Sequence, residues 1–302
     1  MWPLWVGTLI SHASIAQESD LRTAITRHPD RPALFVAGDS TAAPSPKEGQ
    51  EGWGAPFAAY FDASKVNVIN AARGGRSSRT FITEGHWERL VAHIRRGDFV
   101  LIQFGHNDAG ALNEEPPGST RPLRARGTIP GVGEQTQSID NVITGRHEIV
   151  HSYGWYLRKM IADVRERGAT PILLSLTLRN RWSDGRVDCG SGDYRRWTAQ
   201  VAKSAGVQFI DLSRILADRY QALGTEAVKG FFSLDEVHTN ESGAQVNAAA
   251  VVGALRALDR NPFESVLSTK GRAVPLEHDE SKASVCERID ARSHPSAFHA
   301  EG

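Results

Sequence analysis

The stretch Ala33-Leu-Phe-Val-Ala37, followed at once by Gly38-Asp39-Ser40-Thr41, decides the fold of this 302-residue chain. Five consecutive apolar residues without polar alternation are typical of a strand that is buried on both faces, as in a parallel sheet. The glycine, aspartate and serine that follow favour a tight turn. The sequence therefore predicts a buried strand with a serine hydroxyl at its carboxyl end.

Four more short apolar runs follow the first one, and longer amphipathic segments separate them. The predicted strands cover residues 33–37, 66–70, 99–104, 171–176 and 207–211, and the predicted helices cover residues 52–62, 86–95, 154–167, 193–205 and 241–258. Strands that alternate with helices form right-handed βαβ units. We therefore expect an α/β fold, in which helices cover both faces of a five-stranded parallel sheet.

The composition bounds the possible partners. Hydrophobic residues make up 40% of the chain and charged residues 23%, and the formal net charge is zero. These proportions suit a globular protein with a substantial core. A neutral chain has no global attraction to nucleic acid or to an anionic membrane, so we expect neither as a partner. We expect a monomer.

The two ends of the chain differ from its centre. Residues 1–10 are apolar and Ser14-Ile15-Ala16 offers small residues for cleavage, although the first basic residue is Arg22. This pattern indicates a secretory signal, with a docked or irregular N-terminus as the alternative. The apolar run is shorter than the roughly 20 residues that span a membrane. We therefore predict a leader over 1–30, the main domain over 31–260, a polar tail over 261–302, and a secreted or periplasmic protein.

The chain contains two cysteines, Cys189 and Cys286, which both lie in polar, loop-like sequence. Two cysteines do not make a disulfide framework. They would pair in an exported protein, and two free thiols are an equally good interpretation.

Three polar motifs follow predicted strands or open the last predicted helix. They are Gly38-Asp39-Ser40-Thr41, Gly105-His106-Asn107-Asp108 and Asp235-Glu236-Val237-His238. Sites in open parallel sheets form at the carboxyl ends of the strands, so the first two motifs should lie close together. Each motif alone is a common turn, and their joint placement carries the prediction.

These motifs supply the parts of an acyl-transfer site. A serine such as Ser40 attacks an acyl carbon when a base takes its proton and a third group orients that base. The i, i+3 spacing of Asp235 and His238 allows the carboxylate to reach one nitrogen of the imidazole ring. Donors for the oxyanion are the N–H of Ser40, a glycine N–H from residues 72–78, and the side-chain amide of Asn107.

The ordered set Gly-Asp-Ser, Gly, Gly-x-Asn-Asp and Asp-x-x-His resembles the SGNH (GDSL-like) hydrolase superfamily. Ala37-Gly-Asp-Ser-Thr41, Gly75-Arg-Ser77 and Phe104-Gly-His-Asn-Asp108 are similar to the rhamnogalacturonan acetylesterase group within it. The resemblance covers about residues 33–258. It implies a three-layer, flavodoxin-like fold with no cofactor and no metal.

The same resemblance assigns roles to five residues. It implies Ser40 as nucleophile, His238 as base, Asp235 as its orienter, and Gly75 and Asn107 as oxyanion donors. The implied substrate is an acetylated plant polysaccharide, with rhamnogalacturonan in pectin as the first choice. Glu236-Val237 stands where the group has a His-Thr pair, which leaves fine substrate preference open. Alternatives are an ester of xylan, of sialic acid or of a lipid, or a carbohydrate-binding module on an inactive esterase fold.

A rival motif lies at the end of the irregular region 109–150. His147-Glu148-Ile149-Val150-His151 matches the H-E-x-x-H signature of zinc peptidases, in which two histidines one helical turn apart bind the metal. Leu157 occupies the place of the third histidine in the extended form of the motif. We therefore keep a zinc peptidase as a minor alternative and interpret both histidines as residues that fix the loop.

Some polar residues near the motifs have a simpler interpretation. Ser77 and Ser78 are possible nucleophiles but are expected to be hydrogen-bonding loop residues, and Asp108 is expected only to close a turn. Five arginines could meet the carboxylates of a uronate-containing polymer, although solvated surface positions explain most of them. These are Arg73, Arg76, Arg79, Arg179 and Arg181.

Overall fold

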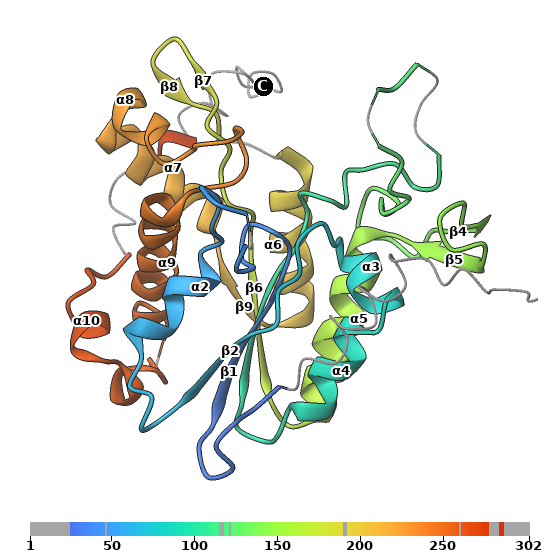
Figure 1. Ribbon diagram of the computed structural model, residues 1–302. Coiled ribbons are helices and arrows are strands. Elements are labelled where there is room, and N and C mark those ends of the chain that lie inside the picture. Colours follow the sequence, from blue (N-terminus) through green and yellow to red (C-terminus); the bar gives the residue numbers. More distant parts are fainter. Residues whose placement is uncertain are drawn as a thin grey trace, which may run out of the picture.

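In the computed structural model, the described residues are 25–45, 47–114, 118–120, 122–189, 192–259, 261–277 and 284–286. The predicted signal segment therefore lies mainly outside the described residues. A five-stranded parallel sheet forms the centre of the molecule (Figure 1), with strand order β2-β1-β3-β6-β9. The strands are β1 (Ala33–Gly38), β2 (Asn67–Asn70), β3 (Phe99–Gln103), β6 (Thr170–Leu174) and β9 (Gln208–Ile210). The predicted five-stranded parallel sheet is confirmed.

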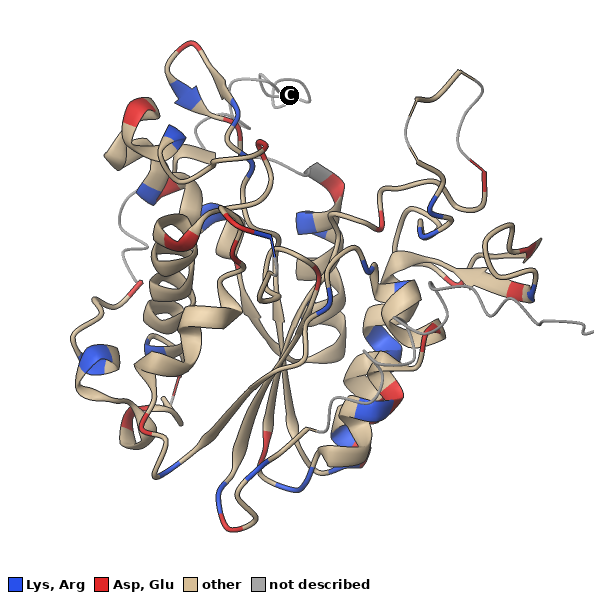
Figure 2. Cartoon of the chain, in the orientation of Figure 1, with Lys and Arg blue, Asp and Glu red and all other residues tan. Residues whose placement is uncertain are grey.

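The first strand is buried on both faces because two separate layers cover the sheet. All six residues of β1 are buried. Leu34 and Val36 belong to one hydrophobic cluster, whereas Phe35 and Ala37 belong to the other. This division follows from the two-residue period of a strand, whose side chains alternate between the faces. Charged residues lie on the helices and loops, and the strands carry almost none (Figure 2).

Seven of the helices form the two outer layers. One layer contains α2 (Gly54–Phe57), α7 (Leu212–Leu223) and α9 (Glu241–Arg256), and the other contains α3 (Ser78–Thr83), α4 (His86–His93), α5 (Tyr153–Glu166) and α6 (Gly192–Ala205). Four long helices were predicted at nearly these bounds. The predicted helix over 52–62 is shorter, because α2 gives way to a 3-10 turn, η1 (Ala58–Tyr60). Helices α3 and α7 and the short α8 (Thr225–Lys229) were not predicted from the sequence.

The region 109–150 is not wholly irregular, as the sequence had suggested. Two strands, β4 (Thr136–Asp140) and β5 (His147–His151), pair antiparallel into a ribbon that projects beside α3 and α5 (Figure 1). No helix in the described part of the chain is both long and apolar enough to span a membrane.

The C-terminal region packs on the domain past the predicted boundary at residue 260. It forms η2 (Glu264–Val266) and α10 (Thr269–Arg272), and Phe263 and Leu267 belong to the hydrophobic core. Cys286 is joined by a disulfide to Cys189, which follows the small hairpin of β7 (Trp182–Ser183) and β8 (Arg186–Val187). This finding resolves the open question about the cysteines in favour of a pair.

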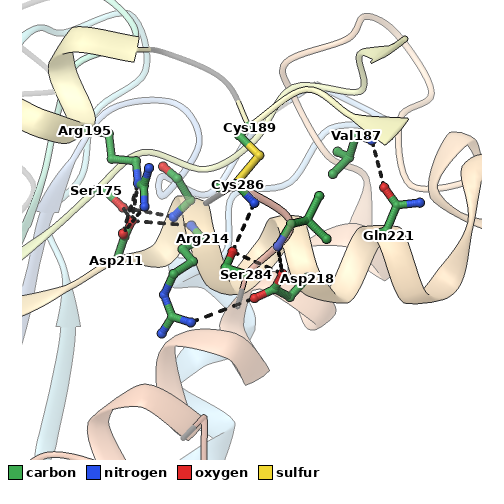
Figure 3. The surroundings of a disulfide bond; sticks show 12 residues. Ser175, Val187, Cys189, Arg195, Asp211, Arg214, Asp218, Gln221, Ser284 and Cys286 are labelled. Carbon is green, nitrogen blue, oxygen red and sulfur yellow. Dashed lines mark hydrogen bonds and ion pairs between the residues drawn. A yellow bond between two sulfur atoms is a disulfide. The ribbon is translucent and has the colours of Figure 1, made fainter. Parts of the chain in front are cut away.

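Hydrogen bonds to α7 hold the segment next to Cys286 in place. Figure 3 shows Asp218, on α7, beside the segment that carries Cys286. The Asp218 carboxylate accepts hydrogen bonds from the N–H of Val285 at 2.8 Å and the hydroxyl of Ser284 at 3.2 Å. The disulfide and these bonds hold residues 284–286 against the layer that contains α7 and α9.

Replacing both cysteines by serine is expected to lower the free energy of unfolding by about 2–5 kcal/mol, because the cross-link closes a loop of 97 residues in the unfolded chain. Thermal unfolding of the double variant and of the oxidised wild-type protein measures the loss. Peptide mapping without reductant should recover the two cysteines in one linked pair. Two alkylatable thiols and an unchanged Tm would contradict the pairing.

Candidate active site

The carboxyl ends of three neighbouring strands bring the predicted motifs together. Strand β1 lies between β2 and β3, and the loops that follow these strands carry Ser40, Gly75 and Asn107. His238 joins them from the loop before α9, which begins after the N-cap Asn240. Together with Ser40, Gly75, Asn107 and His238 line one cavity of about 360 Å³.

A chain of hydrogen bonds joins the serine, the histidine and the aspartate. The Oγ atom of Ser40 lies 2.8 Å from Nε2 of His238, and Nδ1 of His238 lies 2.8 Å from Oδ2 of Asp235. The other carboxylate oxygen, Oδ1, accepts hydrogen bonds from the N–H groups of Val237 and His238, both at 2.8 Å. The imidazole ring is thus held at both nitrogens, with one nitrogen directed at the serine.

The electrostatics of the loop keep the Asp235 carboxyl ionised. Partial burial raises the pKa of this group, but the hydrogen bonds from the side chain and backbone of His238 and from Val237 outweigh burial and lower the pKa below its usual range. Glu236 anchors the same loop on its outer side. Its carboxylate pairs with Arg181, and its carbonyl accepts the N–H of Asn180 at 2.7 Å.

The turn that carries Ser40 is fixed by Asp39. The buried Asp39 side chain accepts hydrogen bonds from the N–H and the hydroxyl of Thr41, at 2.9 and 2.8 Å. Its carbonyl accepts the N–H groups of Ala42 and Ala43. A β-carbon on Gly38 would lie 3.0 Å from the carbonyl oxygen of Gln103, so glycine allows β1 to turn close to β3.

The two predicted oxyanion donors, Gly75 and Asn107, both line this cavity. Gly75 has a φ of +77°, a conformation that favours glycine. The side-chain amide of Asn107 donates one hydrogen bond to the carbonyl of Arg76 at 2.8 Å. An amide nitrogen carries two hydrogens, so this bond fixes the side chain and leaves a second N–H for a ligand. A β-carbon on Gly74 would lie 3.8 Å from the β-carbon of Ser40, which places this loop against the serine.

Asp108 has a larger structural role than the predicted turn. It is buried, and its carboxylate accepts hydrogen bonds from both the hydroxyl and the N–H of Ser78, at the start of α3. Ser77 caps the same helix, so neither serine reaches the cavity as a rival nucleophile. Burial, together with the charge of Asp39, raises the pKa of Asp108 to about 7 although the hydrogen bonds from Ser78 lower it.

The H-E-x-x-H motif forms strand β5 and not a helix, which contradicts the zinc-peptidase alternative. Residues four apart on a strand are about 13 Å apart, too far for His147 and His151 to share a metal that needs nitrogen ligands at about 2 Å. His147 binds Asp140, whereas His151 stacks on Trp155. Among the described residues, no group of three or more His, Cys, Asp or Glu side chains is arranged to hold a metal ion.

Glu148 has a structural partner of its own. Its carboxylate forms two hydrogen bonds, of 2.7 and 2.8 Å, with the guanidinium of Arg79, whose side chain is fully buried. Arg79 also donates to the carbonyls of Leu112 and Gly127. These four bonds attach the β4–β5 ribbon and the loop before it to α3.

The arginines proposed for uronate binding are mostly engaged elsewhere. Arg76 pairs with Glu84 at 2.7 Å, and Arg179 and Arg181 face Glu236. None of the five predicted arginines lines the cavity. Two arginines that sequence reasoning missed, Arg124 and Arg126, do line it. The only sequence signal for them was the unusual length of the region 109–150, which gave no period from which to place single residues.

A parallel α/β sheet that joins a serine, a histidine and an aspartate at its carboxyl edge is typical of α/β serine hydrolases. Residues 36–246 match the model of the GDSL-like lipase/acylhydrolase family, and the chain belongs to that family. It is a carboxylic ester hydrolase, as the sequence predicted.

Two curated relatives carry a more specific name. The chain is 32% identical over 222 residues to a rhamnogalacturonan acetylesterase of Emericella nidulans, a match that covers 74% of this chain and 84% of the relative. It is 28% identical over 256 residues to the rhamnogalacturonan acetylesterase RhgT of Bacillus subtilis, covering 79% and 96%. A solved structure, of the Bacillus subtilis protein YxiM, matches the fold with a TM-score of 0.58 at 24% identity, covering 74% of this chain and 55% of that one.

The raised pKa of Asp108 predicts a pH-dependent loss of stability. Between pH 4 and 7 the folded chain keeps a proton that the unfolded chain releases, so this group lowers the free energy of unfolding as the pH rises, by at most about 1.4 kcal/mol per pH unit. Asp108→Asn cannot titrate, so its stability relative to the wild type should improve over this window. Urea denaturation at several pH values measures both proteins, and parallel curves would contradict the shift.

Proposed function

We propose that this esterase removes acetyl groups from an acetylated plant polysaccharide through an acyl-enzyme, with Ser40 as nucleophile, His238 as base and Asp235 as the group that orients it. The observation that carries the proposal is the continuous chain of two 2.8 Å hydrogen bonds from Ser40 through His238 to Asp235. It opens into a cavity that also holds Gly75 and Asn107.

The geometry supports a two-step transfer. As Oγ of Ser40 attacks the acetyl carbonyl carbon, its proton passes to Nε2 of His238, and the carbonyl π electrons move to the oxygen. The intermediate collapses, the C–O bond to the sugar breaks, and the sugar oxygen takes the proton from His238. Water then attacks the acetyl-serine, His238 takes a proton from the water and returns it to Ser40, and acetic acid leaves.

Asp235 and the oxyanion donors have separate tasks in these steps. The ionised Asp235 carboxylate holds Nδ1–H of His238 and stabilises the imidazolium that forms twice in the cycle. In the proposal, Gly75 and Asn107 donate hydrogen bonds to the tetrahedral oxyanion. Because their loops are tied to each other by the bond from Asn107 to Arg76, the donors are in place before the substrate binds.

The substrate proposal rests on the relatives and on the shape of the surface. Both curated relatives are named for rhamnogalacturonan, and this polymer is our first choice, with acetylated xylan or sialic acid as alternatives. A second, open hollow of about 800 Å³ shares Ser45 and Gln50 with the catalytic cavity and extends to the start of α9. The catalytic cavity and this neighbouring cavity together offer room for several sugar units.

We further propose that the enzyme acts outside the cytoplasm, as a secreted or periplasmic protein. The disulfide between Cys189 and Cys286 supports this location, because disulfides persist in oxidising compartments. The apolar N-terminal sequence supports it as well.

The first test replaces the nucleophile. Ser40→Ala is expected to abolish release of acetate from 4-nitrophenyl acetate and from acetylated rhamnogalacturonan, because no other hydroxyl among the described residues that line the cavity bonds His238. A fluorophosphonate should label the wild type and spare the variant, whereas a binding module would stay unlabelled in both forms. Undiminished turnover by Ser40→Ala would overturn the assignment.

The second test removes one oxyanion donor. Asn107→Ala is expected to lower kcat by about 10²–10³-fold with a small change in KM, because the amide acts on the transition state. Asn113→Ala is the matched control, because Asn113 lies between β3 and β4 and does not line the cavity. This variant should leave kcat unchanged. Equal kinetics for Asn107→Ala and wild type would remove Asn107 from the oxyanion hole.

A further inference from the structure

The catalytic cavity has a positively charged wall that transfer of an acetyl group does not require. Arg124 and Arg126 line it beside Ser40 and His238, and no Asp or Glu is among the described residues that line it. The acetyl ester is neutral, so the chemistry at the ester does not account for this positive charge. This argument rests on the proposed function.

We propose that Arg124 binds a sugar carboxylate of the acetylated polymer and so determines the preference for an acidic polymer. Its Nη1 atom lies 3.8 Å from the position that a β-carbon on Gly75 would take, so the charge stands beside the oxyanion loop. A guanidinium matches a carboxylate in charge and shape and can donate two parallel hydrogen bonds to it.

Arg124 is exposed, and its guanidinium forms no hydrogen bond or ion pair within the described part of the chain. Three other arginines near the site have carboxylate partners: Arg79 binds Glu148, Arg76 binds Glu84 and Arg181 binds Glu236. A ligand that offers a carboxylate to the cavity therefore competes with no internal acid for Arg124.

The loop around Arg124 is held in place, which a binding residue requires. Arg126 donates to the carbonyl of Gly75 at 3.0 Å, and thereby ties this loop to the oxyanion loop. Between the two arginines, Ala125 is buried with a φ of 41°, a backbone conformation that is costly for alanine. The N–H groups of Gly127 and Thr128 bind the carbonyls of Ala111 and Asp108, at 2.7 and 3.0 Å.

Arg126 has a different task in this arrangement. Its side chain lies against Gly110, where an added β-carbon would be 3.4 Å from Cγ of the arginine. Together with the bond to Gly75, this contact makes Arg126 the residue that positions the loop. Arg124, whose guanidinium is exposed, is the residue that meets the substrate.

The test compares Arg124→Gln with the wild type on four substrates. These are acetylated rhamnogalacturonan, the same polymer with its carboxyl groups methyl-esterified, neutral acetylated xylan, and 4-nitrophenyl acetate. We expect kcat/KM on the acidic polymer to fall about 10–100-fold, chiefly through KM, which is the loss of a charge-assisted hydrogen bond. The other three substrates should change less than about threefold.

Two further variants serve as controls. Arg124→Lys keeps the charge without the planar fork and should recover part of the loss. Arg146→Gln removes the same charge from the exposed turn between β4 and β5, outside the cavity, and should behave as the wild type. Raising the salt concentration should weaken the wild type on the acidic polymer more than Arg124→Gln.

Several outcomes would overturn the inference. An equal fall on 4-nitrophenyl acetate would mean that Arg124 stabilises the oxyanion, and an unchanged kcat/KM on the acidic polymer would mean that it is a solvated surface residue. Failure of the proposed function is recognised separately, because the wild type itself would then release acetate from none of the saccharides.

Discussion

The hydrogen bond from Ser40 to His238 is the contact on which the site depends, and it joins residues 198 positions apart. The serine stands at the end of β1, the central strand of the three that carry site loops, whereas the histidine stands before the last long helix. The sheet and α9 must therefore pack correctly before Ser40 meets His238. Two buried layers, one on each face of β1, fix that relation.

Buried polar contacts hold the loop after β2 against the loop after β3, beside Ser40. Asp108 binds Ser78, and Asn107 binds the carbonyl of Arg76, so the loops after β2 and β3 are joined twice. Arg79, fully buried, attaches the β4–β5 ribbon to the same helix through Glu148. A buried arginine with a paired carboxylate is costly to disturb, since either charge alone would be left without a partner. The histidines and glutamate of the H-E-x-x-H motif thus contribute to the scaffold and not to a metal site.

The loop between β3 and β4 lies between this scaffold and the cavity. Arg126 binds the carbonyl of Gly75 and Arg124 lines the cavity, so one segment both supports the loop after β2 and places a positive charge in the cavity wall. Chemistry and selectivity can be separated in such a site, because the ester is neutral and only a neighbouring carboxylate would interact with the arginine. In the layer that contains α7 and α9, the disulfide and Asp218 hold residues 284–286 on α7.

The sequence predicted the parallel sheet, which the structure confirms, and it nominated five site residues as a hypothesis. Continuous apolar runs such as 33–37 indicate strands buried on both faces, and parallel strands bring the loops after their carboxyl ends together, which is why Ser40, Gly75 and Asn107 could be placed at one edge. The i, i+3 spacing likewise joined Asp235 to His238. Tertiary structure alone decided that 147–151 is a strand, that Cys189 meets Cys286, and that Arg124 rather than Arg76 or Arg79 faces the cavity. These outcomes depend on contacts between residues that are far apart in the chain. The local pattern of residues does not predict which arginines form ion pairs with internal carboxylates and which arginine lines the cavity.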